Sequence, residues 1–66
     1  MKDSQGTLLV IGDKLKSSES KECIPAIELI KINGEVGVFK WLINPFKKPF
    51  NLTQKSLTNS TWIVTS

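Results

Sequence analysis

The sequence lacks histidine, arginine and tyrosine, and it holds a single cysteine, Cys23, among its 66 residues. Without histidine, a serine or cysteine nucleophile loses its usual general base, and the commonest neutral metal ligand is missing. One cysteine cannot form an internal disulfide, so we interpret Cys23 as a small buried residue at the start of a strand. The six acids are scattered, and no glycine-rich phosphate loop precedes a helix. We therefore expect a protein that is not an enzyme, with no metal and no cofactor.

Long apolar runs are also missing. Residues 1–6 hold no apolar stretch of signal-peptide length. The longest apolar run near them is residues 8–11, far short of the roughly 18 residues that would span a bilayer. The sequence therefore predicts no membrane insertion, and the lone cysteine favours a reducing compartment, the cytoplasm.

The charge is unevenly distributed along the chain. Nine lysines and six acids give a net charge of +3. Residues 1–33 contain five of each and are neutral, so the whole excess lies past Asn33. All five aromatic residues lie there too, and in residues 39–41 and 46–50 they alternate with lysine. This asymmetry places any working surface in the second half of the chain.

A chain of this length has room for one domain, residues 1–66, with a small apolar core. Residues 7–11 form an apolar run between two glycines, a pattern typical of a short buried strand. Residues 13–22 are polar apart from one leucine, so we expect a surface loop there. Residues 61–65 are rich in β-branched and aromatic side chains, which predicts a final strand.

The clearest local signal is a β-hairpin over residues 26–43. Asn33 and Gly34 separate two apolar segments, and this dipeptide is typical of a type I′ turn, in which both central residues have positive φ. The pairings that such a turn sets are Ile32 with Glu35 and Leu29 with Val38. In that register neither face of the hairpin is cleanly polar. We therefore expect both faces to be covered, by curling of the sheet or by a second copy of the chain as a homodimer.

Two prolines predict a loop over residues 44–51. Asn51 and Gln54 have the spacing of a helix capping box, which predicts one or two helical turns ending at Leu57. The order of elements is then strand, loop, hairpin, loop, helical turn and strand. This order is typical of an all-β fold, a small antiparallel barrel or sandwich with four or five strands, either SH3-like or OB-like.

The basic and aromatic stretch that begins at Phe39 is the candidate binding surface. Its candidate residues are Lys40, Trp41, Phe46, Lys47, Lys48, Phe50 and Lys55. Two of the aromatics lie in a proline-stiffened loop, where a small domain has little room to bury both, and exposed aromatics often anchor protein partners. We expect a protein-interaction module or a small subunit of a larger assembly, with a protein partner.

Two alternatives remain open. The lysines could contact phosphates while the aromatics stack on bases, as in small barrels that bind nucleic acid, although a charge of +3 without arginine is a weak electrostatic footprint. In the other alternative, Phe39, Trp41 and Trp62 form the core and the lysines only keep the surface soluble.

Overall fold

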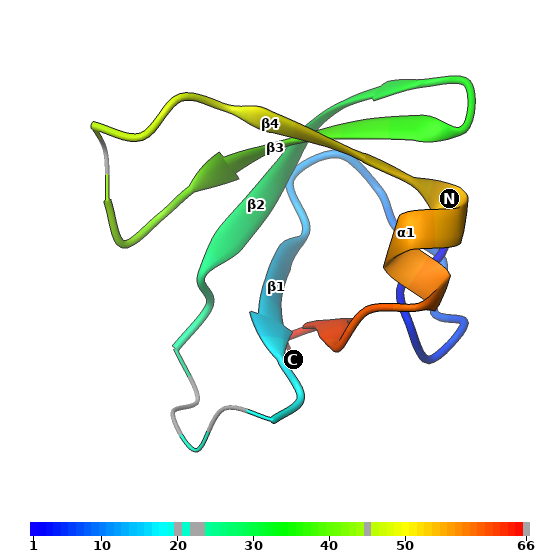
Figure 1. Cartoon of the computed structure of the whole chain (residues 1–66), viewed down its shortest axis with the longest axis horizontal. Helices are drawn as coiled ribbons and strands as arrows, with labels where there is room; N and C mark the ends of the chain where they lie inside the picture. The colour runs from blue at the N-terminus through cyan, green and yellow to red at the C-terminus, as the bar shows by residue number, and fades with distance from the viewer. Residues whose placement is uncertain (20, 22–23, 45, 66) are drawn as a thin grey trace.

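The computed structural model describes residues 1–19, 21, 24–44 and 46–65. Its elements, in chain order, are β1 (Lys14–Ser17), β2 (Ile27–Asn33), β3 (Val36–Trp41), β4 (Phe50–Thr53), α1 (Gln54–Thr58) and β5 (Trp62–Val64). The strands form one antiparallel sheet in the order β4-β3-β2-β1-β5, which curls into a half-barrel (Figure 1). The predicted all-β architecture, with a short helical turn before the last strand, is therefore confirmed. No helix of the described residues is long and apolar enough to cross a membrane.

The β2–β3 hairpin is confirmed, but its turn lies one residue later than the sequence predicts. Asn33 pairs with Val36, so Gly34 and Glu35 are the two loop residues. Gly34 has a φ of 65°, whereas Glu35 does not have positive φ. One positive φ at the first loop position fits a type II′ turn, while the predicted type I′ turn needs two. The predicted pairing of Ile32 with Glu35 is therefore wrong.

A β-bulge between Leu29 and Lys31 changes which side chains share a face of the hairpin. With the observed turn and no bulge, Leu29 would face Lys40. The bulge sets it opposite Phe39, so the predicted pairing of Leu29 with Val38 is wrong, and Leu29 and Phe39 are both fully buried. The inner face carries Ile27, Leu29, Ile32, Phe39 and Trp41. The outer face carries Glu28, Lys31, Asn33 and Lys40 together with Val36 and Val38. The outer face is therefore mixed and not cleanly polar, as the sequence predicts, and a homodimer through this hairpin stays a prediction.

The apolar run at residues 7–11 is not a strand, and this prediction is wrong. Gly6 and Gly12 have φ values of 83° and 100°, so the chain turns at both ends of the run. Only Leu9 of these residues is buried in the core. The exposed large side chains of the run are Leu8, Val10 and Ile11.

The first strand, β1, instead lies inside the segment that was expected to be a surface loop. Its one apolar residue, Leu15, is fully buried and pairs with Ile27 on β2 and Val64 on β5. A strand sends alternate side chains to opposite faces, so four residues need only one apolar side chain to reach the core. The prediction of a loop at residues 13–22 is therefore wrong for β1.

Thr53, rather than Asn51, caps α1. The Oγ1 atom of Thr53 accepts a hydrogen bond from the backbone N–H of Ser56 at 3.1 Å. Residues 50–53 form β4, so the predicted loop over residues 44–51 is wrong at its end. The helix adds Leu57 to the core, whose buried side chains are Leu9, Leu15, Ile27, Leu29, Phe39 and Leu57.

The N-terminal segment covers the outer edge of β5 through Asp3, whose side chain is buried. One carboxylate oxygen of Asp3 accepts hydrogen bonds from the N–H groups of Gln5 and Thr7, each at 2.9 Å. The other oxygen accepts from the N–H of Val64 at 3.0 Å. The carboxylate therefore ties a turn near the start of the chain to the last strand. The neighbouring residue, Lys2, exchanges two hydrogen bonds with the side chain of Gln54, so the N-terminus also lies beside the start of α1 (Figure 1).

Candidate interaction surface

The loop between β3 and β4 presents Phe46, whose side chain is 94% exposed. Asn44 organises this turn. Its side-chain oxygen accepts a hydrogen bond from the N–H of Phe46 at 3.1 Å, and its carbonyl accepts one from the N–H of Lys47 at 3.2 Å. Asparagine side chains commonly stabilise turns in this way. The exposed ring therefore extends from a hydrogen-bonded turn.

Trp41 and Phe50 belong to an aromatic layer that continues into the core. Their ring centroids are 5.0 Å apart with an interplanar angle of 29°, and Phe50 in turn stacks on Phe39 at 5.9 Å. Trp62 meets Trp41 edge-on at 6.4 Å. Phe39 is fully buried, whereas the other three rings are half-buried. Phe50 thus lies on a strand and packs against the core, although the sequence assigned it to an exposed loop.

Lys47 links the loop to this aromatic layer. Its Nζ atom lies 4.8 Å from the centroid of the Trp41 ring, within the range of a cation–π interaction. The structure therefore brings together two of the candidate residues, Trp41 and Lys47, while Phe46, the residue before Lys47, stays exposed. The ammonium group of Lys47 covers the half-buried ring of Trp41.

Two more exposed apolar side chains, both isoleucines, lie at this end of the sheet. Ile24 and Ile43 are 59% and 65% exposed. They lie on the two segments that a hydrogen bond from the N–H of Leu42 to the carbonyl of Ala26, 2.9 Å long, holds side by side. We call Ile24, Ile43 and Phe46 the loop patch. Sequence reasoning missed both isoleucines, and the signal that could have found them is that each lies just outside the paired part of the hairpin.

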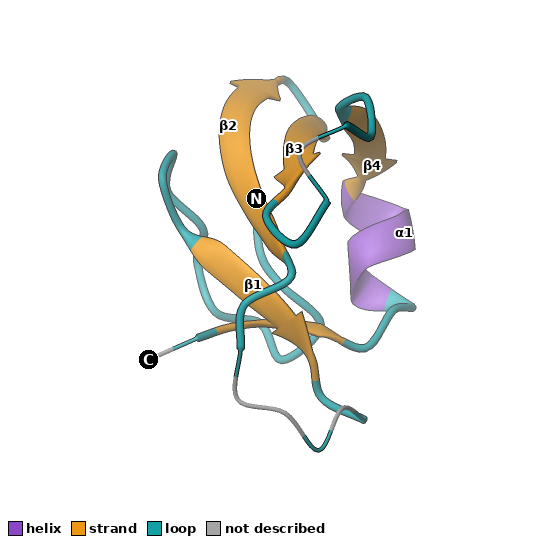
Figure 2. Ribbon diagram, turned by 90° about the vertical axis from the view of Figure 1, so that its left-hand side faces the viewer, coloured by secondary structure: helices purple, strands orange, loops and turns teal. Residues whose placement is uncertain are grey.

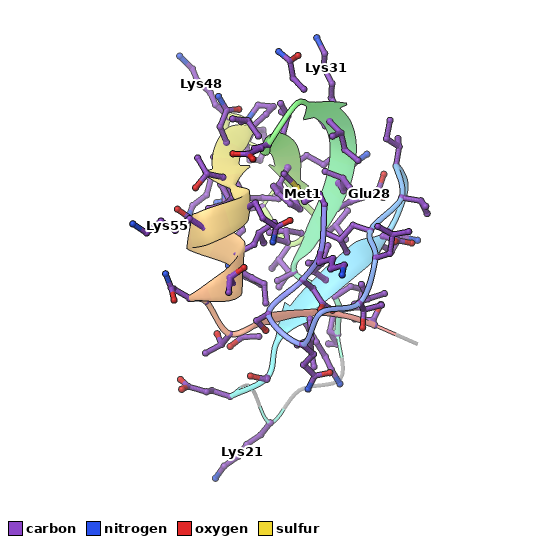
Figure 3. All side chains as sticks on the ribbon, turned by 90° about the vertical axis from the view of Figure 1, so that its right-hand side faces the viewer. Met1, Lys21, Glu28, Lys31, Lys48 and Lys55 are labelled. Carbon is purple, nitrogen blue, oxygen red and sulfur yellow. The ribbon has the colours of Figure 1, made fainter. Side chains whose placement is uncertain are left out.

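The remaining candidate lysines are not part of this patch. Lys40 lies on the outer face of the sheet, where its Nζ is 3.7 Å from a carboxylate oxygen of Glu28. Lys48 and Lys55 are exposed, and they flank β4 in the sequence on its two sides (Figure 3). The seven candidates therefore divide into a loop group, a core aromatic, an outer-face lysine and two lysines that flank β4.

The described residues contain no group of three or more potential metal ligands and no pocket. Cys23, interpreted above as a buried residue, lies outside the described residues. Comparison of the chain with protein-family models, with curated proteins and with solved structures finds no match. Function is therefore inferred from the exposed groups themselves.

Proposed function

We propose that this protein is a non-enzymatic interaction module that binds a protein partner through the loop patch. The observation that carries the proposal is the 94% exposure of Phe46 on a hydrogen-bonded turn, at the same end of the sheet as two more exposed apolar side chains. Exposed aromatic and aliphatic side chains grouped in one place are typical of protein-interaction sites. Because Asn44 already orders the turn, little conformational entropy is lost on binding.

The partner surface is an apolar pocket with acidic groups at its rim. The Phe46 ring fills the pocket, and Lys47 and Lys48 face the acids. The charge of the chain supports this chemistry, because no acid follows Glu35 in the sequence whereas four lysines do. Such rim charges act mainly on association rate and partner choice, while the buried ring supplies most of the affinity.

Replacing Phe46 with a photo-crosslinking phenylalanine analogue in the native host tests this proposal. We expect one dominant cross-linked protein. When that protein is then captured by affinity on chains without the analogue, we expect Phe46→Ala to reduce its capture at least roughly tenfold, the effect of a typical interface anchor. Ile11→Ala is the matched control, because Ile11 is an exposed apolar residue outside the loop patch. The same capture by Phe46→Ala and wild type, or an equal loss in Ile11→Ala, would refute the proposal.

The second candidate function is nucleic-acid binding by the same loop. The exposed ring of Phe46 with Lys47 and Lys48 beside it supports this function, since single strands bind by base stacking and phosphate contact. The Trp41 ring is already engaged by Phe50 and Lys47, which leaves one ring for stacking. Fluorescence anisotropy with labelled oligothymidine and with a duplex, at two salt concentrations, tests this function. Binding that weakens as salt rises supports it, and no binding refutes it.

The proposal also includes an SH3-like barrel instead of an OB-like one. Strands β1 to β4 pair in sequence order, and β5 returns after α1 to pair with β1. This order supports the SH3-like type because an OB-fold is a Greek-key barrel. Amide contacts between Leu15 and Val64 in NMR spectra test the return of β5, and their absence would contradict it.

A cytoplasmic location, supported by the single cysteine, is tested by fractionation of host cells.

A further inference from the structure

One edge strand of the sheet is covered by another segment of the chain, and the other edge strand is open. The N-terminal segment covers the edge of β5, where the N–H of Ser4 donates to the carbonyl of Trp62 at 3.1 Å and Asp3 accepts from Val64. The strand at the other edge, β4, pairs with β3 alone. Figures 1 and 2 show β4 at the margin of the sheet, and the N-terminal segment meets the chain only after β4 ends, where Lys2 hydrogen-bonds the side chain of Gln54. An uncovered edge strand offers its backbone groups to another extended chain.

The register shows which backbone groups of β4 point outward. Asn33 and Val36 close the two-residue turn and so form a hydrogen-bonded pair. The backbone groups of Val36 therefore point toward β2, and those of the next residue, Gly37, point toward β4. The N–H of Gln54 donates to the carbonyl of Glu35 at 2.8 Å, which continues the β3–β4 ladder in the same phase.

Alternate residues of β4 therefore face β3, and the residues between them face outward. The backbone N–H and C=O groups of Phe50 and Leu52 point toward β3, and the N–H groups of Asn51 and Thr53 point away from the sheet. Neither of these two N–H groups has a hydrogen-bond partner among the residues that the structure describes. They are available donors for an added strand.

Lysines flank this edge. Lys48 precedes β4 by two residues and Lys55 follows it by two, and both are exposed, with side chains that extend away from the sheet (Figure 3). Within the described part of the chain, the one ion pair joins Lys40 and Glu28, so no carboxylate there neutralises either lysine. The edge therefore combines two outward N–H groups with a positive charge near each end.

We propose that the edge of β4 binds an extended segment of the partner protein, with acidic residues near both ends of that segment. The added segment accepts hydrogen bonds from Asn51 and Thr53, and its acids pair with Lys48 and Lys55. This mode of binding rests on the proposed function only in that the occupant is a protein.

A second copy of the chain does not fit this edge. Two copies of β4 can pair antiparallel with Asn51 opposite either Asn51 or Thr53 of the other copy. In both registers, Lys48 of one copy is only one residue away from lying directly opposite Lys55 of the other. Parallel pairing sets each of these lysines beside the same lysine of the other copy. Like charges opposite one another destabilise a strand pair, and edge lysines are a common protection against self-association.

The test uses a backbone change that the ladder tolerates. Asn51→Pro removes the outward N–H of residue 51 but leaves the bonds of Phe50 and Leu52 to β3, because proline is compatible with an edge strand at such a position. Asn51→Ala is the matched control, since it removes the same side chain and keeps the N–H. A wild-type-like melting temperature for both variants confirms that the comparison reports on binding.

The probe is an acetylated and amidated peptide of seven residues, alternating valine and threonine between two terminal glutamates. We expect it to slow amide exchange at Asn51 and Thr53 in NMR spectra of the whole protein, and to leave Leu52 unchanged. We expect Asn51→Pro to weaken binding about tenfold, the value of roughly one backbone hydrogen bond, and Asn51→Ala to bind like wild type. No protection at Asn51 and Thr53, equal binding of Asn51→Pro, or tighter binding of the peptide with terminal lysines would overturn the proposal.

The photo-crosslinked partner separates this proposal from the proposed function. Loss of capture in both Phe46→Ala and Asn51→Pro supports both proposals. Loss in Phe46→Ala alone overturns the added strand and leaves the loop patch as the binding site. Capture that neither variant changes overturns both.

Discussion

Replacing Asp3 with alanine removes the acceptor that ties the N-terminal segment to β5. The carboxylate is 3% exposed and accepts three hydrogen bonds. Two of the donors, on Gln5 and Thr7, belong to exposed residues, so water can replace the carboxylate there. The third, the N–H of Val64, lies on a half-buried strand and loses a charge-assisted bond without an equal substitute.

The cost follows from these surroundings. Loss of one half-buried, charge-assisted bond costs about 1.5–3 kcal/mol, and the two exposed bonds add a few tenths each. We therefore expect Asp3→Ala to lower the free energy of unfolding by about 2–3 kcal/mol, a large part of the roughly 3–10 kcal/mol that a chain of this size commonly has. The melting temperature should fall by about 10–20 °C.

Urea unfolding followed by tryptophan fluorescence measures this loss, and two further variants identify its origin. Asp3→Asn keeps one acceptor oxygen for the turn but turns an amide group toward Val64, so it should lose about half as much stability and speed amide exchange at Val64. Asp13→Asn is the control, because that carboxylate accepts a single bond, from the exposed N–H of Val10. If Asp3→Ala stays within about 0.5 kcal/mol of wild type, the carboxylate does not hold the edge of β5.

Three other changes test the core and its margins. Gly37→Ala should cost about 1–3 kcal/mol in urea unfolding, because a Cβ there would lie 2.9 Å from the buried Phe39 ring. Phe50→Ala should cost about 2–4 kcal/mol by the same measurement because it removes a half-buried ring from the aromatic layer, whereas Phe46→Ala should cost under about 0.5 kcal/mol. Equal costs for the two would contradict their assignment to core and surface. Thr53→Ala should cost about 1 kcal/mol through loss of the helix cap, and Thr53→Asn, which keeps a capping oxygen, should cost less.

The hairpin, the helical turn and the last strand could be predicted from the sequence because each has a local cause. The start of the chain could not. The run at residues 7–11 has the composition of a strand, but the turns at its ends and the buried Asp3 direct it along the surface. β1 contains a single apolar residue, Leu15, whose role depends on having neighbours on both sides, Ile27 and Val64. Those are long-range pairings that no local pattern contains.

The candidate site was predicted in part for a similar reason. Phe46 lies in a segment whose prolines and asparagine indicate a loop, and its exposure follows from that segment alone. Phe50 looks equivalent in the sequence, but pairing with Phe39 across the β3–β4 ladder turns its ring into the aromatic layer. Ile24 and Ile43 became visible as surface residues only when the structure showed that the pairing of β2 with β3 ends at Ile27 and Trp41.

The fold also changes where the net charge acts. On the outer face, Lys14, Glu28 and Lys40 lie side by side across three strands, so an acid separates two lysines there. Residues 1–40 contain six lysines and six acids and are neutral, whereas residues 41–66 contain three lysines and no acid. Those three are Lys47, Lys48 and Lys55, and they carry the whole net charge of +3. Lys40 is therefore not part of the candidate site, and the lysines without nearby acids in the sequence lie in the β3–β4 loop and around the edge of β4. This is the charge that the proposed acidic partner would meet, beside the exposed ring and the outward backbone donors of β4.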